Sequence, residues 1–385
     1  MNRSKMNILS SLLIALLATM VFKTGTARAT SSFNCGAWRI VPSSNPGTSS
    51  NMLNGVTATS ANNVWAVGTY SSNEGSGQTL TEHWDGFSWS VVSSPNPGSG
   101  SNSLNGIAAV STSDIWAVGM AGDTNSGISQ TLIEQWNGSS WSVVSSPSPG
   151  SGGSYLSALA AISANDIWAV GYLYSNNPVI QTLIEHWDGT SWSVVSSPNP
   201  GQDNVIYGVA AISTTNAWAV GDYYNPNSSS FQTLTEHWDG SSWSVVSSPN
   251  PGPGINSLNG VAPVPGTSGR FWAVGMYLNA ISSTFQTLLE KWNGKRWKVI
   301  SSPNVGQSDN SLFGVTVVSA TNVWAVGNYA NASNTLIEHW DGSSWSVVSS
   351  PSPGSLVAVA HVPGTHGHVW AVGTDSTQTL TEFYC

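Results

Sequence analysis

The sequence predicts an all-β fold, a seven-bladed β-propeller with four strands in each blade. Two observations carry this prediction: a repeat that occurs seven times, and chain ends that complement each other. Each complete copy runs through a Trp-Ala-Val-Gly strand, a Glu-x-Trp strand, a Trp-x-Val strand and a proline-rich link. Repeats of roughly 40 to 55 residues built from short strands are typical of propeller blades. The central tryptophans of the seven copies are Trp65, Trp116, Trp168, Trp218, Trp272, Trp324 and Trp370.

The third copy shows why four strands are expected. Its first segment is small and apolar, which suits an innermost strand crowded around a central channel. Its second is apolar on both faces, as expected for a sheet between two neighbours. An Asp-Gly turn joins the third and outer strands, and prolines in the link end the blade because they lack the N–H that a ladder needs. The strands are expected at residues 156–163, 167–171, 181–187 and 191–196, with the link at 198–201.

The two chain ends are complementary. The last copy stops at Cys385 without a fourth strand, whereas residues 35–47 have the pattern of a fourth strand and its link with no blade before them. In a ring the missing and the surplus strand fall side by side, but an open stack of repeats has no use for this arrangement. We therefore expect the N-terminal strand to complete the last blade and close the ring.

The only two cysteines, Cys35 and Cys385, support this closure. Alignment with the first copy puts Cys385 at the entry of the turn between the third and fourth strands, and alignment of Trp38 with Trp89 puts Cys35 at its exit. We expect a disulfide that replaces the missing turn, with two unrelated buried thiols as the alternative. In the chain-entropy account, a bridge across so long a loop contributes roughly 5 kcal/mol to stability.

Residues 1–29 have the pattern of a signal peptide. Arg3 and Lys5 precede an apolar run, and a small-x-small pattern places cleavage after Ala29. A disulfide needs an oxidising compartment, which agrees with export. The sequence thus predicts a secreted or extracellular domain at residues 30–385, with an uncleaved membrane anchor as the alternative. The links divide this domain into blades at residues 48–98, 99–150, 151–201, 202–252, 253–306, 307–354, and 355–385 plus 35–47.

The composition excludes several classes of partner. Charged residues make up 8% of the chain and the formal net charge is −9, so the basic patches that bind nucleic acid or anionic membranes are not expected. Twenty tryptophans at fixed phase supply large apolar area, which argues against disorder in the Ser/Gly/Asn-rich stretches. We expect a monomer with no nucleic-acid partner and, after cleavage, no membrane contact.

The pairing of a Val-Trp-Ala-Val-Gly strand with a Trp-Asp-Gly-Ser-Ser-Trp hairpin resembles the bacterial secreted propellers of the kelch and galactose-oxidase-like group. The resemblance covers residues 38–385. Each copy carries one glycine, such as Gly68 or Gly171, where the kelch motif carries a pair. The resemblance implies the fold more than an activity.

The loops between second and third strands differ most between copies, and in propellers they share one face with the links between blades. They are rich in Tyr, Asn and Ser, and aromatic rings with hydroxyl and amide partners suit neutral sugars. We therefore expect a non-catalytic carbohydrate (glycan) binder. The alternatives are a protein-protein interaction or cell-surface scaffold, and ordinary drift of solvent-exposed loops. The expected ligand-binding residues are Tyr172, Tyr174, Tyr223, Tyr224 and Tyr277.

Titratable residues that recur in the repeat are expected to be structural. A catalytic carboxylate is usually unique and has a differently tuned partner, whereas one glutamate occurs in all seven copies and a histidine follows it in four. We expect the glutamates to form hydrogen bonds between blades. The residues are Glu82, Glu134, Glu185, Glu236, Glu290, Glu338 and Glu382, with His83, His186, His237 and His339.

Neither a metal, a cofactor nor a catalytic residue is expected. His361, His366 and His368 are the candidate transition-metal ligands, but no carboxylate or cysteine accompanies them in the local sequence. A sialidase-like site needs clustered arginines, a galactose-oxidase-like copper site needs a cysteine cross-linked to tyrosine, and no Gly-x-Ser-x-Gly elbow or paired-histidine zinc helix occurs. A hydrolase or oxidase is therefore less favoured than a binding protein.

Overall fold

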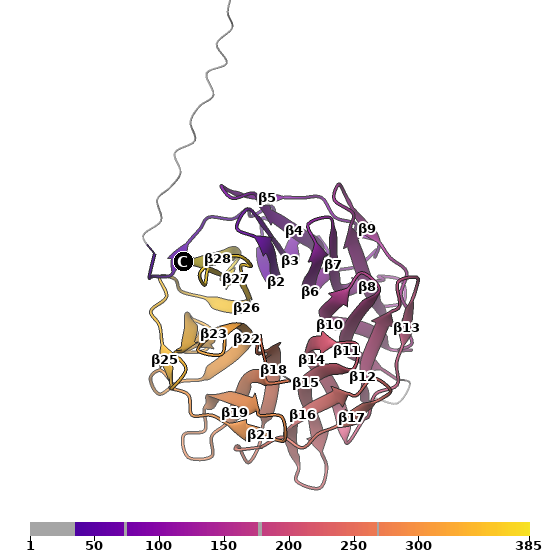
Figure 1. Cartoon of the computed structure of the whole chain (residues 1–385). Helices are drawn as coiled ribbons and strands as arrows, with labels where there is room; N and C mark the ends of the chain where they lie inside the picture. The colour runs from indigo at the N-terminus through magenta and orange to yellow at the C-terminus, as the bar shows by residue number, and fades with distance from the viewer. Residues whose placement is uncertain (1–34, 73–74, 176–178, 268) are drawn as a thin grey trace, which may run out of the picture. The chain divides into compact units, whose positions relative to one another are not determined.

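The computed structural model describes residues 35–72, 75–175, 179–267 and 269–385; the expected signal peptide, residues 1–29, lies outside them. Residues Cys35–Cys385 form one compact unit. In it, seven four-stranded antiparallel sheets are arranged in a ring around a central axis (Figure 1). Within the described ranges every regular element is a strand, and no helix there is long and apolar enough to cross a membrane. The prediction of a seven-bladed propeller is confirmed.

Six blades are built from four consecutive strands, with the first strand at the channel and a three-residue fourth strand at the rim. Blades 1 to 3 contain β2 (Ser50–Ser60), β3 (Asn63–Ser71), β4 (Gln78–Trp84) and β5 (Trp89–Val91); β6 (Asn102–Ser111), β7 (Asp114–Gly122), β8 (Ser129–Trp136) and β9 (Trp141–Val143); β10 (Gly153–Ser163), β11 (Asp166–Tyr174), β12 (Ile180–Trp187) and β13 (Trp192–Val194). Blades 4 to 6 contain β14 (Gln202–Ser213), β15 (Asn216–Asn225), β16 (Ser230–Trp238) and β17 (Trp243–Val245); β18 (Asn256–Pro263), β19 (Phe271–Leu278), β20 (Phe285–Trp292) and β21 (Trp297–Val299); β22 (Asn310–Ser319), β23 (Asn322–Tyr329), β24 (Asn334–Trp340) and β25 (Trp345–Val347).

The seventh blade joins the two ends of the ring. Its sheet has the order β1-β28-β27-β26, so the N-terminal strand takes the outer place beside the last strand. The strands are β26 (Ser355–His361), β27 (Val369–Asp375), β28 (Gln378–Tyr384) and β1 (Arg39–Ile40). The expected closure by the N-terminal strand is therefore confirmed.

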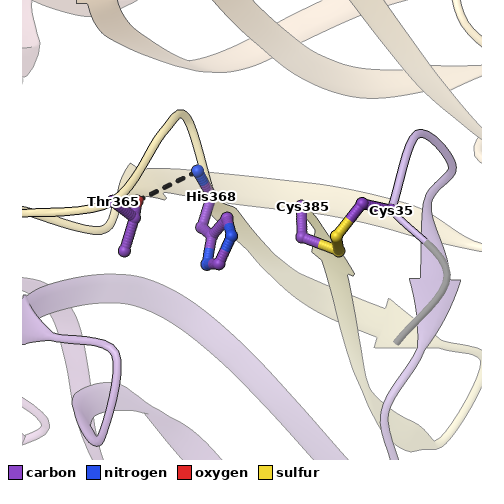
Figure 2. Close-up of a disulfide and its surroundings, with 4 residues drawn as sticks. All are labelled: Cys35, Thr365, His368 and Cys385. Atoms are coloured by element: carbon purple, nitrogen blue, oxygen red, sulfur yellow. Dashed lines mark hydrogen bonds between the residues drawn. A yellow bond between two sulfur atoms is a disulfide. The ribbon is translucent and has the colours of Figure 1, made fainter. Parts of the chain in front are cut away.

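A disulfide fastens this closure where the other blades have a covalent turn. Cys35 and Cys385 are bonded, with their Cα atoms 4.8 Å apart (Figure 2). The N–H of Gly36 donates to the carbonyl of Cys385 at 2.9 Å, and the N–H of Val41 donates to that of Thr381 at 3.0 Å. The expected pairing is confirmed, and the alternative of two unrelated thiols is excluded.

All twenty tryptophans lie in one girdle between the blades, here called the tryptophan girdle. The central tryptophan of each blade packs against two aromatic side chains of the next blade. The ring of Trp168 lies 4.9 Å from that of Trp238 and 5.2 Å from that of Trp243. At the closure, Trp324 packs against Tyr384 and against Trp38 from the N-terminal strand. Each interface thus buries large aromatic surface, which is the main apolar contribution to ring stability.

The glycine of the Trp-Ala-Val-Gly motif permits close approach of the second strand to the first. A Cβ atom at Gly171 would lie 2.0 Å from the carbonyl oxygen of Tyr155 in the inner strand, and a Cβ at Gly68 would lie 1.9 Å from that of Met52. No side chain fits at such a distance. The single glycine in each copy is therefore a packing requirement.

The seven repeated glutamates are buried between blades. The hydroxyl of Ser197, in the link after blade 3, donates to Glu236 of blade 4 at 2.7 Å, and the N–H of Ser44 donates to Glu82 at 3.3 Å. Corresponding bonds join Ser248 to Glu290, Ser302 to Glu338, and Ser350 to Glu382. The expected inter-blade hydrogen bonds are thus confirmed for five glutamates; Glu134 and Glu185 have no hydrogen-bond partner among the described residues.

The repeated histidines hold the start of the second strand. The ring of His186 lies on that of Trp168 with centroids 4.3 Å apart, and its Nε2 lies 2.8 Å from Asp166 Oδ1. His83, His237 and His339 make the same pair of contacts with Asn63, Asn216 and Asn322 and with the central tryptophan of their blade. The structural role expected for these histidines is confirmed.

Candidate functional site

A β-bulge in the innermost strand of every blade turns one side chain toward the channel. The ladder between the first two strands shifts register at the same point in each blade, for example between Ile206 and Gly208 in β14. A bulge leaves one extra residue out of the ladder and re-aims its side chain. The seven residues, here called the bulge positions, are Asn54, Asn105, Ser157, Tyr207, Asn259, Phe313 and Val357.

Three bulge positions hold the frame of the ring. Asn105 Nδ2 donates to the carbonyl oxygen of Leu156 in the next blade at 2.8 Å, and Asn54 and Asn259 make the corresponding bond to their next blades. The other four blades replace this asparagine. In blade 4 the replacement is Tyr207, whose side chain is 36% exposed. The repeat is therefore broken at a position that faces the channel.

The bulge positions line a cavity of about 870 Å³ in the channel. Its lining comes from the middle of the innermost strands and, at Thr69 and Tyr172, from the ends of second strands. At these two residues the cavity extends toward the face that carries the second-to-third loops and the inter-blade links, here called the mouth face. Its wall below the bulge positions is apolar and consists of Val56, Ile107, Leu159, Val209, Val261, Val315 and Val359.

Four tyrosines of blades 3 and 4 gather on one side of this cavity and are here called the tyrosine cluster: Tyr155, Tyr172, Tyr174 and Tyr207. The rings of Tyr155 and Tyr172 stack with centroids 5.1 Å apart and an interplanar angle of 14°, and Tyr174 meets both edge-on. Tyr155, Tyr172 and Tyr207 line the cavity. Burial, followed by the neighbouring Tyr174 and Tyr155, raises the pKa of Tyr172. The cluster is thus a compact aromatic surface with phenol hydroxyls.

A carboxylate lies beside this cluster. Asp222, in β15, is 7% exposed, and its burial raises its pKa to about 6 against the lowering effect of a hydrogen bond from Ser257. Burial first, and then the charge of Asp222 with the phenols of Tyr172 and Tyr174, raises the pKa of Tyr207, so these groups are close enough to interact electrostatically. The other copies carry no acid at the position of Asp222, where they have Thr69, Met120, Tyr172, Met276, Asn328 and Thr374.

The five tyrosines expected to bind a ligand were expected on loops, and this placement is wrong. All five lie in strands, because the ladder between second and third strands continues through pairs such as Tyr174 with Ile180 and Tyr224 with Phe231. Aromatic residues favour such cross-strand pairs. The loops are therefore shorter than the sequence suggested.

The structure brings two of the expected residues together and leaves three elsewhere. Tyr172 and Tyr174 belong to the tyrosine cluster. The hydroxyls of Tyr223 and Tyr277 each donate to a glutamine of the adjacent strand at 2.7 Å, and Tyr224 packs edge-on against Phe231. Tyr70 makes the same kind of tyrosine-to-glutamine bond in blade 1. This bond therefore recurs as part of the frame, although ligand binding by these residues stays a prediction.

Sequence analysis missed Tyr155, Tyr207 and Asp222. The signal that identifies them is departure from the repeat. In most blades the copies align without gaps from the innermost strand to the glycine of the second strand. At their aligned positions, these three residues differ from most of their counterparts. Differences between the loops do not identify them, because all three residues lie in strands.

One group of metal-binding residue types occurs in the described ranges, at the closure. Cys35, Cys385 and His368 place their ligand atoms within 4.8 Å of one another (Figure 2). Because the two sulfur atoms form a disulfide, they are not the thiolates that bind zinc. The backbone N–H of His368 donates to the Thr365 hydroxyl at 3.1 Å, which fixes the adjoining turn. The expectation that the protein has no metal stays a prediction.

The fold and the cavity define a propeller with a ligand-sized pocket in its channel. Among solved structures, the chain is similar to one described as YCF48 bound to D1 peptide, with a TM-score of 0.56 and 14% identity over 92% of this chain and 98% of that chain. It is also similar to YCF48 from Cyanidioschyzon merolae, with a TM-score of 0.56 and 13% identity over 91% and 99%. At this identity the likeness shows the fold alone. No protein-family model and no curated protein matches the chain.

Proposed function

We propose that this propeller is a non-catalytic binding protein that holds an extended polypeptide segment at the mouth of its central cavity. The observation that carries the proposal is the tyrosine cluster on the rim of an apolar cavity of about 870 Å³. Concave, largely apolar sites with a few convergent polar groups are the usual form of a ligand site. The partner would be an extracellular protein or a peptide derived from one.

The stacking of the tyrosines favours a polypeptide over a sugar. Tyr155 and Tyr172 cover each other's faces, whereas sugar recognition uses an aromatic face that is free to meet the apolar face of the sugar ring. The remaining lining offers ring edges, phenol hydroxyls and the side-chain oxygens of Asn54 and Asn105, whose amide nitrogens donate to the next blade. Such a surface matches the alternating side chains and amide groups of an extended peptide.

The similar structures agree with this proposal. A propeller of the same fold, YCF48, has been solved with a D1 peptide, so the architecture accommodates a peptide ligand. The identity of 14% carries no residue across to this chain.

Glycan binding is the second candidate, and one observation favours it. Tyr207 is 36% exposed at the cavity, and its ring is not among the stacked pairs of the tyrosine cluster. A free phenol ring with nearby amides is a suitable partner for one sugar ring. The site for both candidates is the same, so a single experiment separates them.

We also propose that the protein acts outside the cytoplasm. The disulfide between Cys35 and Cys385 supports this location, because disulfides form and persist in oxidising compartments. Secretion through the N-terminal segment stays a prediction, and mass spectrometry of the protein recovered from culture medium would test cleavage after Ala29.

The test of function is selection from a library of random 12-residue peptides against the full-length protein, run beside a glycan array. We expect saturable peptide binding. Tyr172→Thr should weaken it by about tenfold or more, since a buried aromatic anchor contributes 2 kcal/mol or more to an interface. Threonine occupies the corresponding position in blades 1 and 7, so the variant keeps a side chain that the fold accepts.

The matched control is Phe87→Ala. Phe87 is 54% exposed and lies in a third-to-fourth strand turn, on the face opposite the mouth face, so its removal should leave peptide affinity unchanged. Binding to glycans that free sugar competes away, together with no selected peptide, would replace the polypeptide proposal with the glycan candidate.

A further inference from the structure

The two faces of the propeller differ in charge: in the described ranges the mouth face carries carboxylates alone, whereas the opposite face carries both signs, with basic residues beside Asp85, Asp114, Asp166, Asp188, Asp239 and Asp341. On the mouth face, strand ends, loops and links carry carboxylates and, among the described residues, no lysine, arginine or histidine. These carboxylates are Asp123, Asp203, Asp222, Asp309 and Asp375. The basic groups lie at the other ends of the strands: Arg39, Arg270, Lys291, Lys295, Arg296 and Lys298, together with the histidines. A ligand that approaches the cavity from the mouth face therefore meets a negative potential.

The tyrosine cluster sits within this negative face and has the composition of a cation site. Tyrosine rings attract an ammonium or guanidinium group placed over their faces or bonded to their hydroxyls. Tyr172 of blade 3 and Tyr207 of blade 4 line the same cavity, and Asp222 pairs with Val205, two residues before Tyr207 in the adjacent strand. The cavity wall thus offers aromatic surface, and the buried carboxylate of Asp222 lies in the strand behind that wall.

Blade 4 is the one blade that carries a tyrosine at its bulge position and an acid at the position after its Trp-Ala-Val-Gly motif. Its bulge position carries a tyrosine instead of the asparagine of blades 1, 2 and 5, and the position after its Trp-Ala-Val-Gly motif carries an aspartate. Ser257 of blade 5 lies beside that aspartate and lowers its pKa against the effect of burial. Two departures from the repeat therefore lie in adjacent strands of one blade, Tyr207 in the cavity lining and Asp222 behind it.

We propose that the cavity rim over blades 3 and 4 binds the cationic end of the ligand, a lysine or arginine side chain, against the rings of Tyr172 and Tyr207 with Asp222 as the compensating charge. The inference rests on the proposed function, because it names the chemistry of the polypeptide that the site takes. Arginine and lysine are interchangeable in charge but differ in shape, and a peptide selection reports which one is preferred.

The experiment compares two small probes that differ in one charge, Nα-acetyl-lysine methylamide and Nα-acetyl-norleucine methylamide. Their binding to the full-length protein is measured by saturation-transfer NMR titration at pH 8 and at pH 5. We expect the lysine probe to bind about tenfold more tightly than the norleucine probe at pH 8. The lysine ammonium group can form hydrogen bonds and cation–π contacts, which the methyl group of norleucine cannot. The preference should fall at pH 5, since the pKa of Asp222 is about 6 and its carboxyl group is then mostly neutral.

Two variants taken from the repeat itself identify the residues. Asp222→Thr introduces the residue of blades 1 and 7, and Tyr207→Asn introduces the residue of blades 1, 2 and 5. Both should fold, as a melting curve will show, and both should remove most of the preference for the lysine probe. Asp222→Asn is the isosteric form that keeps the volume and loses only the charge, so it should also lose the pH dependence.

The outcomes separate the two proposals. Equal binding of the two probes, or an unchanged lysine preference in Asp222→Asn, overturns the cation site. Selection of peptides without basic residues also overturns the cation site, but it supports the proposal of a polypeptide ligand. A lysine preference in a protein that selects no peptide supports the cation site and overturns the polypeptide ligand. Absence of both probe binding and peptide binding overturns both.

Discussion

The tryptophan girdle and the bulge positions are built from the same seven repeats but behave in opposite ways. The girdle has a tryptophan at the centre of every blade interface, and each of these seven side chains is nearly fully buried. The bulge positions, one strand further inward, carry Asn, Ser, Tyr, Phe or Val. An interface between blades tolerates little change because its volume is fixed, whereas a side chain at the channel is free to vary with function.

This difference indicates where the repeat encodes the fold and where it encodes a ligand site. A residue that recurs in all seven blades supports closure of the ring, as the buried glutamates and the motif glycines do. A residue that breaks the repeat in one blade at a channel-facing position, such as Tyr207, is a candidate for binding. The following predictions test that division, beginning with the largest expected effect.

Removal of one girdle ring should cost the most stability. Trp168 is 2% exposed and contacts Trp238 and Trp243 of the next blade. We expect Trp168→Ala to lower the free energy of unfolding by about 3 to 5 kcal/mol, through lost burial and the cavity left behind. Urea denaturation monitored by circular dichroism measures the free energy of unfolding. Phe87→Ala, at an exposed position, should change stability by no more than about 0.5 kcal/mol; similar losses in the two variants would contradict the assignment of the girdle.

The buried glutamates should make stability depend on pH. Burial raises the pKa of Glu185 to about 8, well above its value in the unfolded chain. A group whose folded pKa is raised contributes stability that is present below the unfolded pKa and is lost as pH rises through the folded pKa. The melting temperature should therefore fall between about pH 5 and pH 9, the interval over which the raised pKa values near 7 to 8 are crossed.

A single variant tests the source of this pH dependence. Glu185→Gln removes one titrating group. At pH 9 the native carboxylate is charged and buried without a hydrogen-bond partner among the described residues, so we expect the variant to raise the free energy of unfolding there by about 2 kcal/mol or more, since an unpaired buried charge costs more than a neutral polar group. At pH 5 we expect little change. Asp188→Asn is the control, because hydrogen bonds from Thr190 and Ser191 hold the pKa of Asp188 at about 2. A pH profile that Glu185→Gln leaves unchanged would show that this glutamate does not titrate in the interval.

The smallest effects on stability are expected at the bulge positions. The loss of stability should depend on whether the residue bonds to the next blade. Asn105→Val, which introduces the residue of blade 7, loses the 2.8 Å bond to Leu156 and should cost about 1 kcal/mol. Tyr207→Asn, which introduces the residue of blades 1, 2 and 5, should change stability by no more than about 0.5 kcal/mol. Thermal denaturation of both variants measures the contrast. A larger loss in Tyr207→Asn would mean that Tyr207 supports the frame.

The fold was predictable from the sequence to an unusual extent, while the site was only partly so. The number of blades, the order of strands and the closing strand follow from the spacing of tryptophans and from the phase of the two ends. The pairing of Cys35 with Cys385 follows from the same alignment. Of the expected ligand residues, Tyr172 and Tyr174 lie in the tyrosine cluster, but Tyr223, Tyr224 and Tyr277 make contacts within or beside their own strands.

The sequence by itself determined the ring, because each blade repeats one local pattern and its apolar faces have a single partner, the next blade. Only the tertiary structure decided which side chains face the channel. Alternation along a strand assigns faces with a period of two, and the bulge before Gly208 interrupts that period, so the position of Tyr207 at the cavity cannot be counted from the sequence. Tyr172 and Tyr207 likewise come from strands of two blades, and only the packing of those blades brings both into one cavity lining.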